Sequence, residues 1–148
     1  MSKKIVRQCG ACGNDFEFAP CPSRSGRGKW CSRACYHSPA GLAERFWGRV
    51  DRAGPVLVAT LGPCWVWTGH RNNQGYGRIS VGRRADGWAL AHRVAWELAR
   101  GPITAPCVLH RCDGGAIGCV RPDHLFLGTQ ADNVADMCAK RRHWSQVG

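Results

Sequence analysis

Two hydrophobic patterns can be distinguished along the chain, separated near residue 55. In the first part, Leu42, Phe46 and Val50 recur every fourth residue, which predicts a short amphipathic helix. Ser38 and Pro39 supply an N-cap and a first helical residue, and we expect this helix to end near residues 53–55. Residues 5–35 are rich in Gly, Pro, Ser and Arg and poor in aliphatic side chains, so this segment cannot build a core of its own.

From Cys64 onward the pattern predicts short strands alternating with helices. A polar turn at residues 69–74 separates the first two strands. Gly101 marks the end of the helix at residues 92–100. Thr129, followed three residues later by Asp132, forms the start signal of the last helix. The expected elements are strands at 64–68, 75–81 and 88–91, a helix at 92–100, an extended segment at 106–110 and a helix at 130–141. We therefore expect a small α+β protein.

The expected domain organisation has three parts. Residues 1–40 form a basic module, residues 41–61 form a linker helix, and residues 62–148 form a second domain. No internal repeat is apparent in the sequence.

The charge of the chain points to a polyanionic partner. The 148 residues carry 21 Lys+Arg against 10 Asp+Glu, a formal net charge of +11, and 17 of the basic residues are arginine. A guanidinium group is a planar fork that binds phosphate through two hydrogen bonds. This bias favours a nucleic-acid partner over a merely solvated basic surface.

The chain has ten cysteines, and whether they bind metal or form disulfides depends on the cellular compartment. The first ten residues lack the apolar run of a secretion signal, and no stretch approaches the ~20 apolar residues that a membrane span needs. We therefore expect a cytoplasmic protein with no membrane partner. In a reducing compartment, spaced cysteines bind metal more often than they form disulfides.

The first expected metal site lies in the core-poor N-terminal segment. Cys9 and Cys12 form one close pair, and Cys31 and Cys35 form a second. Two such knuckles hold one tetrahedral zinc ion, whose binding supplies on the order of 10 kcal/mol of folding free energy. The alternative is that these cysteines only pack. Cys21 fits neither pair.

A second group of chemically active residues begins at His110 and ends at Asn133. Metal-assisted phosphodiester hydrolysis needs a base that deprotonates water and a hard cation bound by oxygen ligands. A histidine at a strand end and an asparagine on the next helix can supply both across a narrow β-β-α hairpin.

Several ordered motifs in this half resemble those of HNH homing-type endonucleases of phages. The matching segments are residues 64–69, 75–77, 91–97 and 110–136, which cover roughly residues 62–142. The cysteine module also resembles the small zinc-binding segment often attached to such nucleases. The resemblance implies a β-β-α-metal (HNH, treble-clef-like) nuclease core preceded by a short zinc-knuckle module. It implies Mg²⁺- or Mn²⁺-dependent cleavage of DNA phosphodiesters.

The family roles carry over onto individual residues. His110 matches the general base, Asn133 matches the ligand of the catalytic metal, and His124 lies where many relatives have Asn. Leu109 is a departure, because many relatives have a metal-binding Asp immediately before the base, and leucine cannot bind a cation. Either a nearby carboxylate replaces it, or the metal relies on Asn133, phosphate oxygens and water. The candidate carboxylates are Asp113, Asp132 and Asp136.

Cys112, Cys119 and His124 suit zinc rather than Mg²⁺, because sulfur is a soft ligand. Family members with this cysteine pattern begin the domain with Cys-Trp, so the resemblance favours Cys64 as the fourth ligand, with Cys107 as the alternative. Zinc here would fix the loop that follows the base. The alternative is that Cys112 and Cys119 are simply buried thiols. We expect about two structural zinc ions per chain, one for each four-ligand site.

Candidate DNA contacts flank the expected catalytic core. His92 and Arg93 stand at a helix start and could meet a phosphate there, although a histidine in this position is more often structural. Tyr76 could pack on a DNA backbone or only on the sheet. The remaining candidates are Arg78, Arg83 and Arg84 around the expected hairpin, and Arg141 and Arg142 after the last helix.

The favoured function is a metal-dependent endonuclease acting on double-stranded DNA, with His110 as base and a divalent metal near Asn133. The alternative is a zinc-stapled DNA-binding module without catalysis, which Leu109 keeps open. An RNA-binding zinc protein is a third, weaker possibility. A phage-encoded protein of this kind would act in the cytoplasm of a bacterial host, as a monomer or a dimer.

Overall fold

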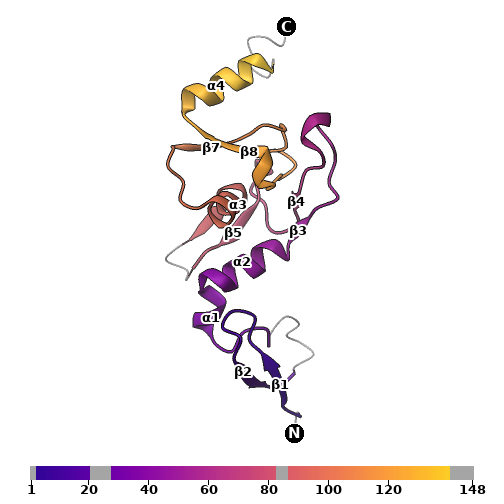
Figure 1. The fold of residues 1–148 in the computed structure, drawn as a ribbon, viewed down its shortest axis with the longest axis vertical. Helices are drawn as coiled ribbons and strands as arrows, with labels where there is room; N and C mark the ends of the chain where they lie inside the picture. The colour runs from indigo at the N-terminus through magenta and orange to yellow at the C-terminus, as the bar shows by residue number, and fades with distance from the viewer. Residues whose placement is uncertain (1–2, 21–27, 83–86, 141–148) are drawn as a thin grey trace. The chain divides into compact units, whose positions relative to one another are not determined.

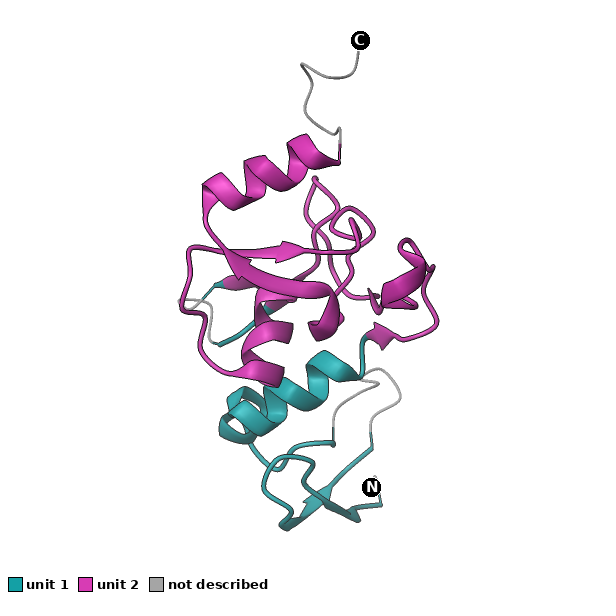
Figure 2. Ribbon diagram, turned by 45° about the horizontal axis from the view of Figure 1, so that its top comes forward, with its two compact units in different colours: residues 1–49, 80–87 teal, residues 50–79, 88–148 magenta. Residues whose placement is uncertain are grey.

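The computed structural model describes residues 3–20, 28–82 and 87–140 (Figure 1). They fall into two compact units, coloured separately in Figure 2. The first unit comprises residues 1–49 and 80–87, and the second comprises residues 50–79 and 88–148. Helices and two-stranded sheets occur together, so the small α+β class predicted from the sequence is confirmed.

In the first unit, a hairpin precedes two short helices. Strand β1 (Ile5–Gln8) pairs antiparallel with β2 (Asp15–Phe18), and α1 (Arg33–His37) is followed by α2 (Pro39–Trp47). The Ser38 hydroxyl accepts a hydrogen bond of 3.1 Å from the backbone N–H of Gly41. The predicted helix start is therefore confirmed.

The helix α2 ends earlier than the sequence pattern indicated. Its C-cap is Gly48, whereas the periodicity of the chain suggested an end near residues 53–55. The physical reason is that Val50 belongs to a strand, β3 (Val50–Asp51), which pairs antiparallel with β4 (Val66–Trp67). Apolar spacing had placed Val50 on a helix face because a two-residue strand has no periodicity that would reveal it.

Among the described residues, three two-stranded sheets lie wholly or mainly in the second unit. Besides the β3–β4 pair, β5 (Arg78–Ser80) pairs with β6 (Trp88–Leu90), and β7 (Cys107–His110) pairs antiparallel with β8 (Leu125–Gly128). The helices are α3 (Ala91–Arg100) and α4 (Gln130–Ala139), with 3₁₀ turns η1 (Ala59–Leu61) and η2 (Pro122–His124). The predicted helices and the extended segment before His110 are thus confirmed, with ends shifted by a few residues.

The hairpin expected between residues 64–68 and 75–81 does not form as two paired strands. Val66 instead bridges Cys119, and the backbone N–H of Trp67 donates to the carbonyl of Gly118 at 2.9 Å. The edges of β4 are therefore taken by β3 and by the loop before Val120. The tight turn nevertheless exists, because the N–H of Asn72 donates to the carbonyl of Tyr76 at 2.9 Å.

Trp67 is the largest fully buried side chain among the described residues of the second unit. Gly77 packs so closely on its indole that a Cβ at this position would collide with the ring. This contact explains the second glycine of the Gly-Tyr-Gly motif. Within the described parts of the chain, no helix is long and apolar enough to cross a membrane.

Candidate active site and metal centres

Strands β7 and β8 and helix α4 together present the predicted catalytic residues. His110 is the last residue of β7 and lies opposite Leu125 of β8, and α4 packs against both strands (Figure 1). Thr129 and Asp132 form the predicted capping box that fixes the start of α4. A cleft of about 540 Å³ opens there. It is lined by all five residues expected from the sequence to be catalytic: His92, His110, Asp113, Asn133 and Asp136.

The orientation of the His110 ring is fixed by one hydrogen bond. Its Nε2 lies 2.9 Å from the backbone carbonyl oxygen of Cys119. A carbonyl oxygen only accepts, so Nε2 carries the proton and donates, which leaves Nδ1 with its lone pair. Burial lowers the pKa of His110, which favours the neutral ring. A Cβ on Gly115 would lie only 3.5 Å from Nδ1, so this glycine keeps the space beside Nδ1 open.

His92 packs beside the proposed base. Its ring centroid lies 5.1 Å from that of His110 and 5.9 Å from that of Tyr76. Only 8% of the residue is exposed, and burial lowers its pKa to about 3. His92 is therefore a neutral, packed imidazole. The neighbouring Arg93 also lines the cleft and donates through its guanidinium to the carbonyl of Pro106 at 3.2 Å.

Lys140 contacts both carboxylates of the cleft. Its Nζ lies 2.7 Å from Oδ1 of Asp113 and 2.8 Å from Oδ1 of Asp136. It also donates to the backbone carbonyls of His110 at 3.4 Å and Arg111 at 3.3 Å. Burial lowers the pKa of Lys140, but the two aspartates outweigh it and raise the pKa overall.

The third candidate carboxylate has a different role. Oδ2 of Asp132 accepts from the backbone N–H of Thr129 at 2.7 Å and from its hydroxyl at 2.8 Å. These bonds lower the pKa of Asp132 and use its carboxylate as a helix cap. Leu109, the position at which the resemblance led us to expect a metal-binding Asp, is buried and also lines the cleft.

The second cysteine group comes together in the interior of the second unit. The potential ligand atoms of Cys64, Cys112, Cys119 and His124 all lie within 4.8 Å of one another, and all four residues are buried. Nδ1 of His124 lies 3.7 Å from Sγ of Cys64 and 3.6 Å from Sγ of Cys119. Cys107 is not a member, and its Sγ instead lies 3.9 Å from Oε1 of Gln130.

The donor set of this group fits zinc. His124 donates from Nε2 to the carbonyl of Leu61 at 2.9 Å, which leaves Nδ1 as the lone-pair nitrogen facing the sulfurs. Burial raises the pKa of Cys64, while the side chain of Cys112 lowers that of Cys119. Three buried sulfurs and one buried imidazole nitrogen are a donor set that suits a closed structural zinc site.

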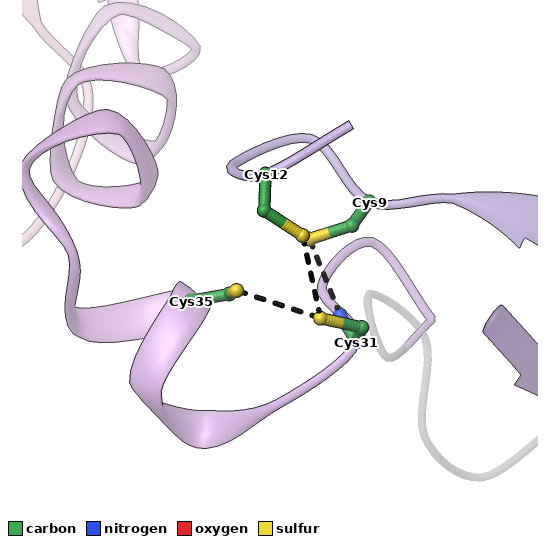
Figure 3. A group of neighbouring side chains, drawn as sticks. All are labelled: Cys9, Cys12, Cys31 and Cys35. Carbon is green, nitrogen blue, oxygen red and sulfur yellow. Dashed lines mark hydrogen bonds between the residues drawn. The ribbon is translucent and has the colours of Figure 1, made fainter. Parts of the chain in front are cut away.

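The first cysteine group has a similar donor set (Figure 3). The ligand atoms of Cys9, Cys12, Cys31 and Cys35 lie within 4.8 Å of one another. Sγ of Cys31 lies 3.7 Å from that of Cys12 and 3.4 Å from that of Cys35, close to the roughly 3.8 Å between sulfurs that share a tetrahedral zinc. Cys21 lies outside the described residues.

Backbone N–H groups lower the pKa of one thiol in this first group. The N–H of Cys31 donates to Sγ of Cys9 at 3.4 Å. Burial would raise the pKa of Cys9, but N–H groups of the surrounding loop hold it at about 6. The crowded sulfur of Cys31, in contact first with Cys35, has its pKa raised to about 12. One thiol of the group thus loses its proton easily and another keeps it. Such a group suits a cation that replaces the remaining protons.

The other candidate DNA contacts divide into two sets. Tyr76 lines the cleft, and the Arg78 guanidinium lies 6.0 Å from the ring of Trp88. Arg83, Arg84, Arg141 and Arg142 fall outside the described residues, so their DNA contacts stay predictions.

Sequence reasoning did not assign a role in the cleft to Gly115 or Lys140. No local signal marks Gly115, because its importance depends on where His110 points. Lys140 does carry a signal, since it follows Asp136 by four residues, the spacing of helical ion pairs.

One family model matches part of the second unit. Residues 89–135 match the family model HNH_3, described as HNH endonuclease. The matched segment runs from β6 into α4 and includes His92, His110 and Asn133. The chain therefore contains a segment similar to HNH endonucleases, and the resemblance to that family noted in the sequence is confirmed.

Two phage proteins are similar to this chain over part of their length. Protein 2.8 of Escherichia phage T7 is 36% identical over 86 residues, 58% of this chain and 57% of that protein. Protein 7.7 of the same phage is 40% identical over 80 residues, 53% of this chain and 58% of that protein. The chain thus spans somewhat more than half the length of these relatives. No solved structure matches it.

Proposed function

We propose that this protein is a metal-dependent endonuclease that hydrolyses phosphodiester bonds of double-stranded DNA. The observation that carries the proposal is the orientation of His110, whose Nε2 donates to the Cys119 carbonyl at 2.9 Å. This leaves the lone pair on Nδ1 in a cleft that Asn133 also lines, inside a segment that matches the HNH model. In this proposal β7, β8 and α4 form the β-β-α-metal core.

The proposed reaction begins with proton removal from a water molecule by Nδ1 of His110. The water oxygen forms a bond to phosphorus as the bond between phosphorus and the leaving oxygen breaks, and the proton stays on the imidazole. When bound through the side-chain oxygen of Asn133, Mg²⁺ or Mn²⁺ would supply positive charge for the leaving oxygen. The amide of Asn133 is a hard oxygen donor, which fits such an ion.

Zinc has a structural role in this proposal. The carbonyl that orients His110 belongs to Cys119, whose sulfur is part of the second cysteine group. A zinc ion bound by this group would therefore hold the base in position through one backbone link. A second zinc would stabilise the basic module at residues 1–40, which has the four cysteines of the first group.

The proposed DNA contacts follow the rim of the cleft. Arg93 and Tyr76 line it, and a guanidinium beside a phosphate is a contact that orients DNA without reading its sequence. Arg78 is proposed as a further backbone contact. The phage relatives support action in the cytoplasm of a bacterial host.

Cleavage of supercoiled plasmid with Mg²⁺ or Mn²⁺ tests the proposal, using the intact chain beside His110→Ala. We expect the intact chain to nick the plasmid and His110→Ala to lose at least 100-fold in rate while it still retards DNA in a gel. Asn133→Ala should also cleave more slowly. His37→Ala in the first unit is the matched control and should cleave at the normal rate.

A non-catalytic DNA-binding module is the second candidate. Leu109 favours it, because a buried leucine replaces a metal-binding carboxylate. If the intact chain retards DNA in a gel but fails to cleave it with either metal, this second function replaces the first.

A further inference from the structure

The ammonium group of Lys140 lies among four oxygen atoms in the second unit. We propose that Lys140 is the counter-ion of the two cleft carboxylates: it neutralises Asp113 and Asp136, so that neither carboxylate binds the catalytic metal. This inference rests on the proposed function, because it concerns the metal that the cleft would hold. Together with the capping role of Asp132, it leaves none of the three candidate carboxylates to replace the aspartate that many HNH relatives have at the position of Leu109.

The first step of the argument is the geometry. Two of the four oxygens are carboxylate atoms, of Asp113 at 2.7 Å and Asp136 at 2.8 Å. The other two are the carbonyls of His110 at 3.4 Å and Arg111 at 3.3 Å. An ammonium group has three donors, so these four acceptors satisfy it. The loop after β7 is thereby tied to the end of α4.

The second step is the electrostatics. The exposed fraction of the side chain is 27% for Lys140, 37% for Asp113 and 23% for Asp136, so solvent screens this group only in part. Each carboxylate has one oxygen within 2.8 Å of the same nitrogen. A divalent ion bound by both aspartates would therefore have to displace the ammonium group from its closest contacts.

The third step is that the backbone positions of Asp113, Asp136 and Lys140 suit the ion pairs that these residues form. Lys140 follows Asp136 by four residues at the end of α4, which places both on one helix face. Asp113 has a left-handed backbone with φ of 59°, a conformation that Asp and Asn tolerate better than other side chains with a Cβ. The loop thus presents its carboxylate to Lys140 at a backbone position suited to aspartate.

The consequence concerns how the catalytic metal is held. Because both aspartates are paired with Lys140, the remaining ligands for the catalytic metal are Asn133, phosphate oxygens of the DNA and water. The protein alone should then bind Mn²⁺ weakly. Removing the ammonium group should leave two carboxylates facing each other, which is an arrangement that attracts a divalent ion.

The test is Mn²⁺ binding to the full zinc-loaded chain without DNA, followed by the electron paramagnetic resonance signal of free Mn²⁺. We expect Lys140→Met to raise Mn²⁺ affinity at least tenfold, and the double variant with Asp113→Asn to return it to the starting value. Lys140→Arg keeps the charge and should show no gain. Lys29→Met, which removes the lysine paired with Glu44 in the first unit, is the matched control and should also show none.

The single variants Asp113→Asn and Asp136→Asn provide an independent arm that does not require Lys140→Met to fold. Both should change Mn²⁺ affinity less than twofold. A tenfold loss in either one would make that aspartate a metal ligand and overturn the inference, as would a folded Lys140→Met without any gain. Because this assay needs neither DNA nor cleavage, its result is separate from that of the plasmid assay.

Discussion

Substitution of Gly115 by alanine tests whether the Nδ1 side of His110 is where water is activated. The added methyl carbon would lie 3.5 Å from Nδ1 and 3.3 Å from Cε1 of Tyr76. Gly115 does not have the left-handed φ found at several other glycines of the described chain, so alanine does not strain its backbone. The change therefore acts on the space beside the base.

The size of the effect follows from the same distances. A water that hydrogen bonds to Nδ1 must approach it to about 2.8 Å, and a methyl group 3.5 Å from that atom takes up part of the room. A displacement of the reacting water by about 1 Å can lower the rate about 100-fold, which corresponds to about 2.7 kcal/mol in the activation free energy. The tight Tyr76 contact should lower the free energy of unfolding by only about 1 kcal/mol.

The assay is single-turnover nicking of plasmid with Mg²⁺, together with gel retardation and thermal unfolding of each variant. Gly115→Ala should cleave about 100-fold more slowly while it still retards DNA in a gel. Gly48→Ala is the matched control, because Gly48 has an ordinary right-handed backbone and caps α2 in the first unit. If Gly115→Ala cleaves at the normal rate, Nδ1 does not activate the water.

Three further predictions concern metal, stability and DNA. Elemental analysis should find about two zinc ions per chain, falling to about one in Cys64→Ala, which should also cleave poorly because Cys119 no longer holds His110 firmly; an unchanged zinc content would contradict the second site. Thr129→Ala removes a hydroxyl that accepts from the Asp132 N–H at 3.2 Å and should lower the free energy of unfolding by about 1 kcal/mol in denaturant titrations. DNA affinity should fall steeply as salt rises, because phosphate contacts by Arg and Lys release counterions; a flat response would argue against a basic binding face.

Local chemistry accounts for what could be predicted from the sequence. The starts of α2 and α4 were predictable because Ser38 and Thr129 cap N–H groups only three residues away. The cysteines of the first group were predictable because close pairs have the spacing of metal knuckles. For the second group, spacing and resemblance left Cys64 and Cys107 open, and the structure places only Cys64 with the other three residues.

Contacts between distant segments account for what could not be predicted. The β3–β4 pair joins two-residue strands, which are too short to show a period of two. The contacts of Lys140 with Asp113 and with the carbonyls of His110 and Arg111 depend on where the loop after β7 meets α4, which no local pattern encodes. The orientation of His110 likewise depends on a carbonyl nine residues away in the sequence.

The most direct test of the central claim is chemical rescue of His110→Gly by imidazole in the plasmid assay with Mg²⁺. Removing the side chain leaves a space in the cleft that free imidazole can enter. The variant should nick DNA at least 100-fold more slowly than the intact chain, and added imidazole should restore part of the rate in proportion to its unprotonated concentration. Full cleavage by His110→Gly without imidazole would contradict the claim that His110 is the general base.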